Sequence, residues 1–322
     1  MSVKELIKIE NLKKYFPIKS GIISRISNYV KAVDGIDLSI PVGQTIGLVG
    51  ESGCGKTTLG KTIIKLLEPT SGEIIFENNN LTHLNASNMR PYRREMQIVF
   101  QDPYGSLNPR MKVESIVSEG LAIHNILSGN ERKDFIRELM NTVGLREDAL
   151  SRYPHEFSGG QRQRIAIARA LALKPKFIVC DEPISALDVS VQAQIINLFI
   201  ELQEKFELTY LFISHDLRVV RHISDKVAVM YLGKIVEISP SKELYKNPLH
   251  PYTQILISSV PIADPSRKRV KTVLKGDVPS PINPPSGCSF HPRCPIAVEK
   301  CKTVEPELRD VGSDHLVSCH MV

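Results

Sequence analysis

The chain has 322 residues, and its 41 Lys and Arg against 35 Asp and Glu give a formal charge of +6 with a pI near 8.9. Hydrophobic residues make up 42% and charged residues 24%, which is typical of a globular protein and excludes a disordered chain. No apolar run approaches the ~18 residues of a membrane-spanning helix, and the opening MSVKELIKIENL lacks the apolar core of a signal peptide. We therefore expect a protein that stays in the cytoplasm, and the mild positive charge does not by itself indicate a nucleic-acid partner.

The amino-terminal elements are predicted to be strands, in the segments LIKIENLKKYF, KAVDGIDLSIPVG and QTIGLVG. Between the first two, residues 18–31 carry Lys19, Arg25 and Lys31 without opposing acids, which favours a loop. That loop is either a basic excursion toward acidic lipid or a partner, or simply a solvated basic loop. After Gly55, LGKTIIKLL has helical spacing and ends at PTSG, and EIIFENNNL then alternates like a strand with an Asn-rich turn.

Helices dominate from about residue 116 to residue 169, in ESIVSEGLAIHNI, ERKDFIRELMNTVGL and GGQRQRIAIARALAL. Two short apolar runs, FIVCD and TYLFISHD, predict buried strands around the long helix VQAQIINLFIELQEKF, and KVAVMYLGKIVEI predicts a hairpin with its turn near Gly233. This alternation predicts an α/β fold, with a parallel sheet covered by helices and interrupted by a helical insert. Beyond residue 247 we expect a domain boundary, because prolines become frequent at Pro251, Pro261, Pro265, Pro279, Pro281, Pro284 and Pro285.

A phosphate-binding motif follows the third predicted strand. GESGCGKT, residues 50–57, fits G-x-x-x-x-G-K-[ST] between a buried strand and a helix, a context that disfavours a chance glycine turn. The backbone amides of such a loop surround a polyphosphate, Lys56 reaches the terminal phosphates, and the Thr57 hydroxyl coordinates Mg²⁺. Cys54 is expected to contribute its backbone amide, with a reactive thiol as the alternative. The predicted nucleotide-binding residues are Gly50, Glu51, Ser52, Gly53, Cys54, Gly55, Lys56, Thr57 and Thr58.

A pair of acidic residues ends the strand FIVCD. Asp181 is suited to holding Mg²⁺ through water, and Glu182 to polarising an attacking water. Two adjacent acids after a strand also occur as caps of the following helix. The presence of a phosphate loop in the same chain favours the catalytic interpretation.

Further motifs resemble those of ATP-binding cassette (ABC) proteins. FSGGQRQR, residues 157–164, is similar to the family's signature motif, with Phe157 in place of the commoner leucine. The segments IVFQDP, SALD and ISHD match its Q-loop, D-loop and switch histidine, in the family's order. The resemblance implies a P-loop NTPase with a RecA-like core, a helical subdomain and an antiparallel β subdomain, plus a small Cys-rich carboxyl-terminal tail. The residues carried over are Gln101, Ser185, Ala186, Leu187, Asp188 and His215, and Phe16, or else Tyr15, for stacking on adenine.

The resemblance also implies a mechanism in which two cassettes pair head to tail. ATP then lies between residues 50–58 of one cassette and Ser158, Gly159, Gly160 and Gln161 of the other. Glu182 is the general base, His215 hydrogen-bonds the γ-phosphate, Gln101 senses Mg²⁺ and couples to a membrane partner, and Asp188 links the two sites. A hydrolase triad of Ser214, His215 and Asp216 is rejected, because neighbours along one strand point to opposite faces.

Longer segments narrow the resemblance to one subfamily. QDPYGSLNPRM, ALDVSVQAQIINL, NPLHPYTQILISSVP and GDVPSPINPPSGCSFHPRCP resemble the ATPase subunits of oligopeptide and dipeptide importers, the F-type more than the D-type. The implied partners are a paralogous D-type ATPase subunit, two permease subunits and, indirectly, an extracytoplasmic peptide-binding protein, at the cytoplasmic face of the membrane. Nickel or glutathione importers are the alternative. A soluble ABC ATPase acting on DNA or ribosomes is disfavoured, because such proteins fuse two cassettes or carry a long coiled coil.

Four cysteines crowd the end of the chain with the spacing C-x5-C-x6-C-x17-C, which by itself indicates only four thiolates close in sequence. The subfamily resemblance implies that Cys288, Cys294, Cys301 and Cys319 bind a [4Fe-4S] cluster, with a Zn²⁺ site or free thiols as alternatives. The expected domains are an ABC nucleotide-binding domain at 1–247, with its helical subdomain at about 102–168, and a transporter carboxyl-terminal region at 248–322 that holds the metal.

Overall fold

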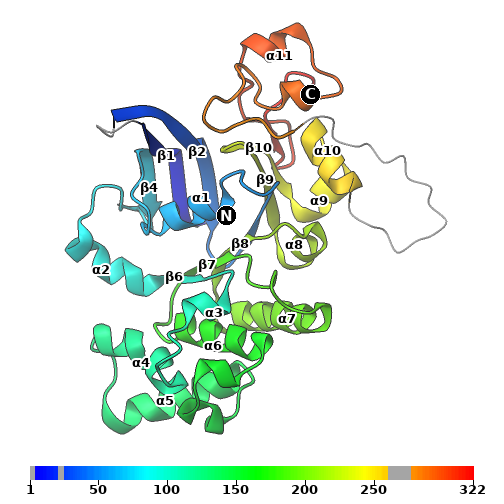
Figure 1. Cartoon of the computed structure of the whole chain (residues 1–322). Helices are drawn as coiled ribbons and strands as arrows, with labels where there is room; N and C mark the ends of the chain where they lie inside the picture. The colour runs from blue at the N-terminus through cyan, green and yellow to red at the C-terminus, as the bar shows by residue number, and fades with distance from the viewer. Residues whose placement is uncertain (1–3, 21–24, 260–276) are drawn as a thin grey trace, which may run out of the picture. The chain divides into compact units, whose positions relative to one another are not determined.

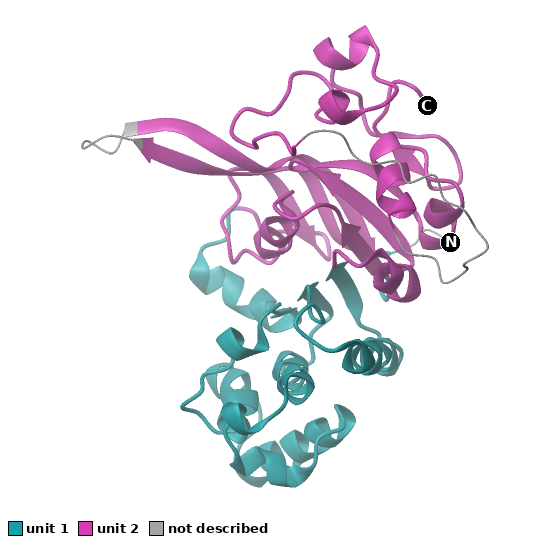
Figure 2. Ribbon diagram, turned by 45° about the vertical axis from the view of Figure 1, so that its right-hand side comes forward, with its two compact units in different colours: residues 1–4, 41–44, 83–213 teal, residues 5–40, 45–82, 214–322 magenta. Residues whose placement is uncertain are grey.

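The computed structural model describes residues 4–20, 25–259 and 277–322 (Figure 1). It divides into two compact units, coloured separately in Figure 2. Unit 1 comprises residues 1–4, 41–44 and 83–213, and unit 2 comprises residues 5–40, 45–82 and 214–322. Two of the prolines that placed the predicted boundary, Pro261 and Pro265, lie outside the described residues, and residue 247 itself lies inside unit 2.

Unit 2 contains a four-stranded antiparallel sheet of order β2-β1-β4-β5. Its strands are β1 Glu5–Ser20, β2 Arg25–Pro41, β4 Ser71–Phe76 and β5 Asn79–Asn80. The predicted basic loop at 18–31 is wrong for most of its length, because β1 continues to Ser20 and β2 begins at Arg25, forming a long hairpin (Figure 2). Charged side chains are compatible with such strands, since alternate residues of an antiparallel strand face solvent. Residues 21–24 of that segment lie outside the described residues.

A second sheet in unit 2 carries the strand before the phosphate motif. Its order is β11-β12-β10-β9-β3, with β3 parallel to β9 and the other neighbours antiparallel. The strands are β3 Thr45–Val49, β9 Lys226–Tyr231, β10 Lys234–Pro240, β11 Arg309–Asp310 and β12 Leu316–Val317. The predicted turn near Gly233 is confirmed by the pairing of Tyr231 with Lys234. The helices of unit 2 are α1 Lys56–Ile63, α8 Leu217–Ile223, α9 Ser241–Lys246, α10 Pro251–Ser258 and α11 Glu299–Thr303, with the 3-10 turn η3 His291–Arg293.

Unit 1 contains three parallel strands, in the order β6-β7-β8. They are β6 Met96–Val99, β7 Phe177–Asp181 and β8 Thr209–Ile213, and β7 and β8 are buried along their whole length. Both predicted buried strands are therefore confirmed. The helices of unit 1 are α2 Ala86–Glu95, α3 Pro103–Ser106, α4 Val113–Ile123, α5 Gly129–Thr142, α6 Gly159–Leu171 and α7 Val189–Phe206, with the 3-10 turns η1 Glu147–Ser151 and η2 Pro154–Glu156.

The predicted helical insert corresponds to α4, α5 and α6. Helix α6 packs against α3, α4, α5 and α7 within unit 1 (Figure 1). The middle of α6 is apolar, with Ile165, Ala166, Ile167 and Ala168 all buried, so this helix forms the core of the helical part of unit 1. Among the described residues, no helix has both the length and the apolar composition needed to cross a bilayer.

Candidate functional site

The predicted phosphate loop lies between β3 and α1 in unit 2. Gly55, which precedes the first residue of α1, has φ +108°, in the left-handed region where a side chain causes strain. A Cβ atom at this position would lie 2.0 Å from the carbonyl oxygen of Ala32. The glycine is therefore required both by backbone conformation and by the close approach of a neighbouring chain segment.

Lys56 is hydrogen-bonded to the backbone of this loop. Its side chain is buried, with a residue exposure of 5%, and its Nζ atom donates to the carbonyl oxygens of Gly50 at 2.8 Å and Glu51 at 3.0 Å. These bonds hold the ammonium beside the loop backbone, at the amino-terminal end of α1, where the helix dipole also favours an anion. Burial raises the pKa of the Cys54 thiol, which disfavours the thiolate and therefore the reactive-thiol alternative.

The outer side of the loop is held by residues from the last quarter of the chain, a feature that the motif did not predict. The Glu51 carboxylate accepts from both terminal nitrogens of Arg293, at 2.8 and 3.0 Å. The Glu51 backbone N–H donates to the Tyr252 hydroxyl at 2.9 Å. The residues lie 242 and 201 positions apart in sequence, so no local pattern could have identified these contacts.

The predicted catalytic carboxylate lies in unit 1, directly after β7. Asp181 ends this strand and is 3% exposed, whereas the Glu182 side chain is partly exposed. Glu182 has φ +46°, an unusual conformation for a residue with a side chain, and its N–H donates to the carbonyl of Ile213 at 3.0 Å. The amide nitrogen of Gln101 donates to the Glu182 carboxylate at 3.1 Å, so the structure brings these two predicted site residues together.

The segment that follows Gln101 is attached to α6. The guanidinium of Arg162 lies 3.6 Å from the ring centroid of Tyr104, and Arg162 also donates to the carbonyl of Pro154 at 2.6 Å. A second arginine of α6, Arg169, donates to the carbonyl of Ser106 at 2.5 Å. Tyr104 nevertheless remains 65% exposed, so α3 presents a large aromatic side chain on the surface of unit 1.

The signature residues form the start of α6. Ser158 and Gln161 make a capping box, in which the serine Oγ accepts from the Gln161 N–H at 3.4 Å and the serine N–H donates to the glutamine side chain at 3.0 Å. Ser158 and Gln161 are exposed. Gly160 is buried, and a Cβ atom there would lie 2.4 Å from a methyl of Val191, so a small residue lets α6 approach the start of α7.

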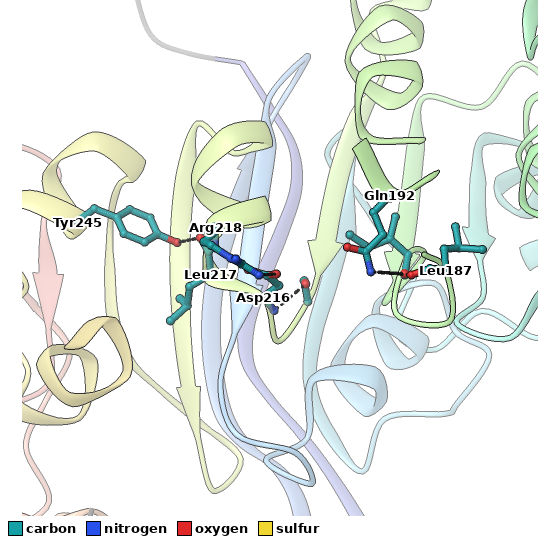
Figure 3. Close-up of polar contacts among 8 residues, drawn as sticks. Leu187, Gln192, Asp216, Leu217, Arg218 and Tyr245 are labelled. Atoms are coloured by element: carbon teal, nitrogen blue, oxygen red, sulfur yellow. Dashed lines mark hydrogen bonds and ion pairs between the residues drawn. The ribbon is translucent and has the colours of Figure 1, made fainter. Parts of the chain in front are cut away.

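The D-loop residues are held by α7. The side-chain amide of Gln192 donates to the carbonyls of Ile184 at 3.1 Å and Leu187 at 3.0 Å (Figure 3). Asp188 is the first residue before α7 and is exposed, as is Val189, at 82%. The backbone of the D-loop is therefore held by Gln192, while Asp188 and Val189 at its end are exposed.

The predicted switch residue His215 is exposed and lies between β8 and α8, in unit 2. Its neighbour Asp216 caps α8, because its carboxylate accepts from the Arg218 N–H at 2.9 Å and from the Arg218 guanidinium at 2.8 Å (Figure 3). The Asp216 carboxylate therefore acts as the N-cap of α8.

The two aromatic candidates for adenine stacking lie next to each other on β1. The Tyr15 hydroxyl donates to the Asp34 carboxylate, and burial together with this carboxylate raises the pKa of Tyr15. Phe16 is half-buried, with the Lys14 ammonium 5.0 Å from its ring centroid. Since Tyr15 is bound to Asp34, the contacts favour Phe16 over Tyr15 as the stacking residue.

The cluster prediction for the four carboxyl-terminal cysteines is wrong. No group of three or more His, Cys, Asp or Glu side chains that could hold a metal occurs among the residues that the structure describes, which include all four cysteines. The Zn²⁺ alternative fails for the same reason. All four thiols are free of disulfide bonds.

The tail is instead held by contacts with the rest of unit 2. Strand β12 pairs with β10, and the Phe290 ring packs against Tyr231 and Tyr252, with centroids 5.3 Å from each. His315 forms a buried pair with Glu237 at 2.7 Å. These contacts attach the tail to the sheet and the core of unit 2.

The predicted Mg²⁺ ligands have suitable chemistry. Hydroxyl, amide and carboxylate oxygens, offered by Thr57, Gln101 and Asp181, are the ligand types that Mg²⁺ prefers. The nitrogen of Gln101 is engaged by Glu182, which leaves its amide oxygen as the atom suited to a cation. The residue types therefore fit a magnesium ion.

Comparison with known proteins finds two family matches along the chain. The family described as ABC transporter matches residues 33–185, and the one described as Oligopeptide/dipeptide transporter, C-terminal region, matches residues 236–301. The Oligopeptide transport ATP-binding protein AppF of Bacillus subtilis (strain 168) is 55% identical, covering 98% of this chain and 97% of that protein. The Probable peptide ABC transporter ATP-binding protein y4tS of Sinorhizobium fredii is 49% identical, covering 98% and 90%.

Solved structures show the same fold. The ATP-binding cassette MJ0796, in a dimeric post-hydrolysis state bound to ADP and Pi, matches with a TM-score of 0.65 at 29% identity, covering 73% of this chain and 98% of that one. The cbiO1 structure from Clostridium perfringens, part of the ABC transporter complex cbiONQ, also gives a TM-score of 0.65, at 28% identity over 76% of this chain and 92% of that one.

Proposed function

The chain belongs to the family of ABC transporter ATP-binding proteins and is an ATPase with that family's fold, and from this premise we propose that it powers the import of oligopeptides or dipeptides. The observation that carries the proposal is the full-length similarity to AppF, together with the match of residues 236–301 to a region described for oligopeptide and dipeptide transporters. Nickel and glutathione are the competing substrates.

Nucleotide binding is assigned to residues 50–58 and Phe16. The backbone amides of the loop and the Lys56 ammonium would bind the phosphates, and Phe16 would stack on adenine. Bound Mg²⁺, held by Thr57, Asp181 and Gln101, supplies charge neutralisation for the phosphates when it is present. The fit of the oxygen ligands and the buried position of Lys56 support this assignment.

Hydrolysis is assigned to Glu182, which would take a proton from the attacking water. The Gln101 amide, whose nitrogen lies 3.1 Å from the Glu182 carboxylate, would orient this carboxylate by donating to it. His215 would hydrogen-bond the γ-phosphate. These roles are those expected for the matching positions of the family.

A second cassette would complete each ATP site. Ser158, Gly159, Gly160 and Gln161 would bind the γ-phosphate of ATP held by the partner, and Asp188 would connect the two sites. The exposure of Ser158, Gln161 and Val189 supports this pairing, because it leaves the start of α6 and of α7 accessible to another chain. We propose a paralogous D-type subunit as the partner.

The remaining partners follow from the transporter role. Two permease subunits would dock on residues 101–111, where the exposed Tyr104 is held in place by Arg162, and a peptide-binding protein would deliver substrate on the far side of the membrane. The chain would then work at the cytoplasmic face. In this proposal, residues 1–247 form the nucleotide-binding domain, with its helical subdomain at about 102–168, and residues 248–322 form the transporter-specific region.

Transport by the reconstituted complex tests the proposed substrate. The chain is purified with its permeases and partner ATPase, placed in proteoliposomes with the binding protein, and supplied with labelled di- and oligopeptides, glutathione or ⁶³Ni²⁺. We expect ATP-dependent peptide uptake that Lys56→Ala abolishes. Uptake of nickel or glutathione without peptide uptake would identify the alternative, and co-purification with ribosomes or DNA in place of permeases would refute the transport role.

A further inference from the structure

Arg293 forms a two-pronged ion pair with the first variable residue of the phosphate loop. Its Nη1 and Nη2 atoms donate to the two carboxylate oxygens of Glu51, at 2.8 and 3.0 Å. The Arg293 side chain is 6% exposed and that of Glu51 is 22% exposed. Two parallel hydrogen bonds from a planar guanidinium fix the orientation of a carboxylate and also neutralise its charge.

The backbone of Glu51 is anchored by the same part of the chain. Its N–H donates to the Tyr252 hydroxyl at 2.9 Å, and Tyr252 is fully buried, with its ring centroid 4.8 Å from that of Tyr231. Arg293 also donates to the Tyr231 hydroxyl at 3.4 Å. Both the side chain and the main chain of Glu51 are therefore held by residues of the carboxyl-terminal region and the sheet beneath it.

Glu51 presents an electrostatic problem for a loop that binds an anion. Its carboxylate is attached next to Gly50, whose carbonyl accepts from the phosphate-binding Lys56. A negative charge at such a position repels a polyphosphate, and partial burial weakens the screening by water. The Arg293 guanidinium neutralises this charge and holds the carboxylate in one orientation.

We propose that Arg293 is a positioning residue for ATP, which neutralises and orients Glu51 so that the phosphate loop accepts nucleotide. Through this contact the transporter-specific tail sets the ATP affinity of the cassette. The inference rests on the proposed nucleotide site and adds to it a dependence on a residue far from the motif. Its expected signature is electrostatic: the harm done by losing Arg293 is caused by the carboxylate that remains.

Nucleotide titrations of the full-length chain test this inference. Each variant carries Glu182→Gln to prevent hydrolysis, and Mg²⁺ with the fluorescent analogue mant-ATP is the probe. We expect Arg293→Gln to raise the Kd about tenfold, which corresponds to about 1.4 kcal/mol. Adding Glu51→Gln to Arg293→Gln is expected to bring the Kd back to within about threefold of the reference, because the unpaired charge is gone. Arg309→Gln is the matched control, since Arg309 lies in the same tail and donates to the carbonyl of Val322.

The outcomes separate an electrostatic from a merely structural role. If the double variant binds as weakly as Arg293→Gln or more weakly, or if Arg293→Gln leaves the Kd unchanged, the inference is wrong. Where Arg293→Gln unfolds, Arg293→Lys keeps the positive charge without the fork, so a Kd within about threefold of the reference is expected, and a Kd about tenfold higher would overturn the electrostatic role. Failure of the reference chain itself to bind mant-ATP, with Lys56→Ala no different, would refute the proposed nucleotide site instead.

Discussion

The two helix starts that carry the nucleotide motifs are held in different ways. Helix α1 follows a loop whose Lys56 is 5% exposed and whose Glu51 is bound by Arg293 and Tyr252, more than 200 residues away in sequence. Helix α6 is capped by Ser158, which is exposed and whose capping partner Gln161 lies three residues away. The phosphate loop is therefore held by contacts from distant parts of unit 2, whereas the signature is capped locally and is exposed.

The difference indicates that one chain can form the phosphate-loop half of the proposed ATP site by itself, whereas the signature half serves the site of another chain. A loop held by distant contacts is preorganised before nucleotide arrives, so little ordering is needed on binding. The start of α6 is fixed by its local cap, but in the proposed mechanism the nucleotide that it contacts is bound by another chain. Variants that affect nucleotide binding, folding and helix capping separately can test this contrast.

The largest effect is expected from Glu182→Gln in unit 1. Replacing the carboxylate removes the proposed general base while keeping the shape and the hydrogen bond from Gln101, so hydrolysis by the assembled complex should fall about 10³-fold. Binding of mant-ATP should persist, because the loop of unit 2 is untouched. Phosphate release and nucleotide titration measure the two properties, and hydrolysis at the wild-type rate would refute the assignment of the base.

Gly55→Ala should damage the preorganised loop directly. The added Cβ atom would meet the Ala32 carbonyl at 2.0 Å in a left-handed backbone, so we expect a loss of about 3 kcal/mol or more in the free energy of unfolding, with loss of nucleotide binding. Gly53→Ala is the matched control, because Gly53 has φ +78° but no atom lies within 4 Å of the added group, and about 1 kcal/mol is expected there. Urea unfolding measures both, and equal losses would contradict the role assigned to the close approach.

Acid should weaken the anchorage of the phosphate loop through His250. This residue is 1% exposed, its Nδ1 accepts from the Tyr252 N–H at 3.1 Å, and burial lowers its pKa to about 4. Between pH 4 and 6.5 the unfolded chain then binds more protons than the folded chain, so stability from this group is complete above pH 6.5 and falls as the pH drops toward 4. The loss is at most about 3 kcal/mol.

Thermal unfolding between pH 5 and 7 can isolate this contribution. His250→Asn keeps an acceptor at the start of α10 without titrating, so its stability should depend less on pH than that of the wild type. Glu237, which accepts from the His250 N–H at 3.0 Å, is unchanged in both chains. Identical pH profiles would show that His250 does not contribute to the pH dependence of stability.

The smallest effect is expected at the signature. Ser158→Ala removes the acceptor for the Gln161 N–H, and the loss of such a cap costs about 1 kcal/mol in the free energy of unfolding. Hydrolysis by the assembled pair should also fall, since the serine would face ATP of the partner. Ser190→Ala is a suitable control for the substitution itself, because Ser190 is an exposed serine at the second position of α7. A loss as large as that of Gly55→Ala would contradict the local character of this segment.

The sequence predicted the parts of the molecule that are encoded by local pattern. The strands β3, β7 and β8 are short apolar runs, which can be recognised in the sequence. The motif from Gly50 to Lys56 can also be recognised, because its residue types and spacing are those that phosphate binding requires. The start of α6 was equally visible, since its glycines and Ser158 lie in one segment. What these regions share is that every determining residue lies within about ten positions of the others.

Predictions failed where charge or cysteine content was interpreted without knowledge of partners. Lys19 and Lys31 indicated a loop at 18–31, yet an antiparallel hairpin tolerates them on strands. The four tail cysteines are close in sequence, but their number does not reveal whether their sulfurs converge or remain protonated. The Arg293–Glu51 pair was invisible because its two residues are 242 positions apart.

The short strand β12 has a consequence for how copies of this protein behave in a crowded solution. It pairs with β10 at Ile238 and Glu237, and Ser318 adds a further bond to the carbonyl of Val236 at 2.9 Å. Without it, the exposed main-chain groups of β10 would form an open template for a strand from another molecule. Residues 316–322 thus cover this edge, and we expect their proteolytic removal to promote self-association through β10.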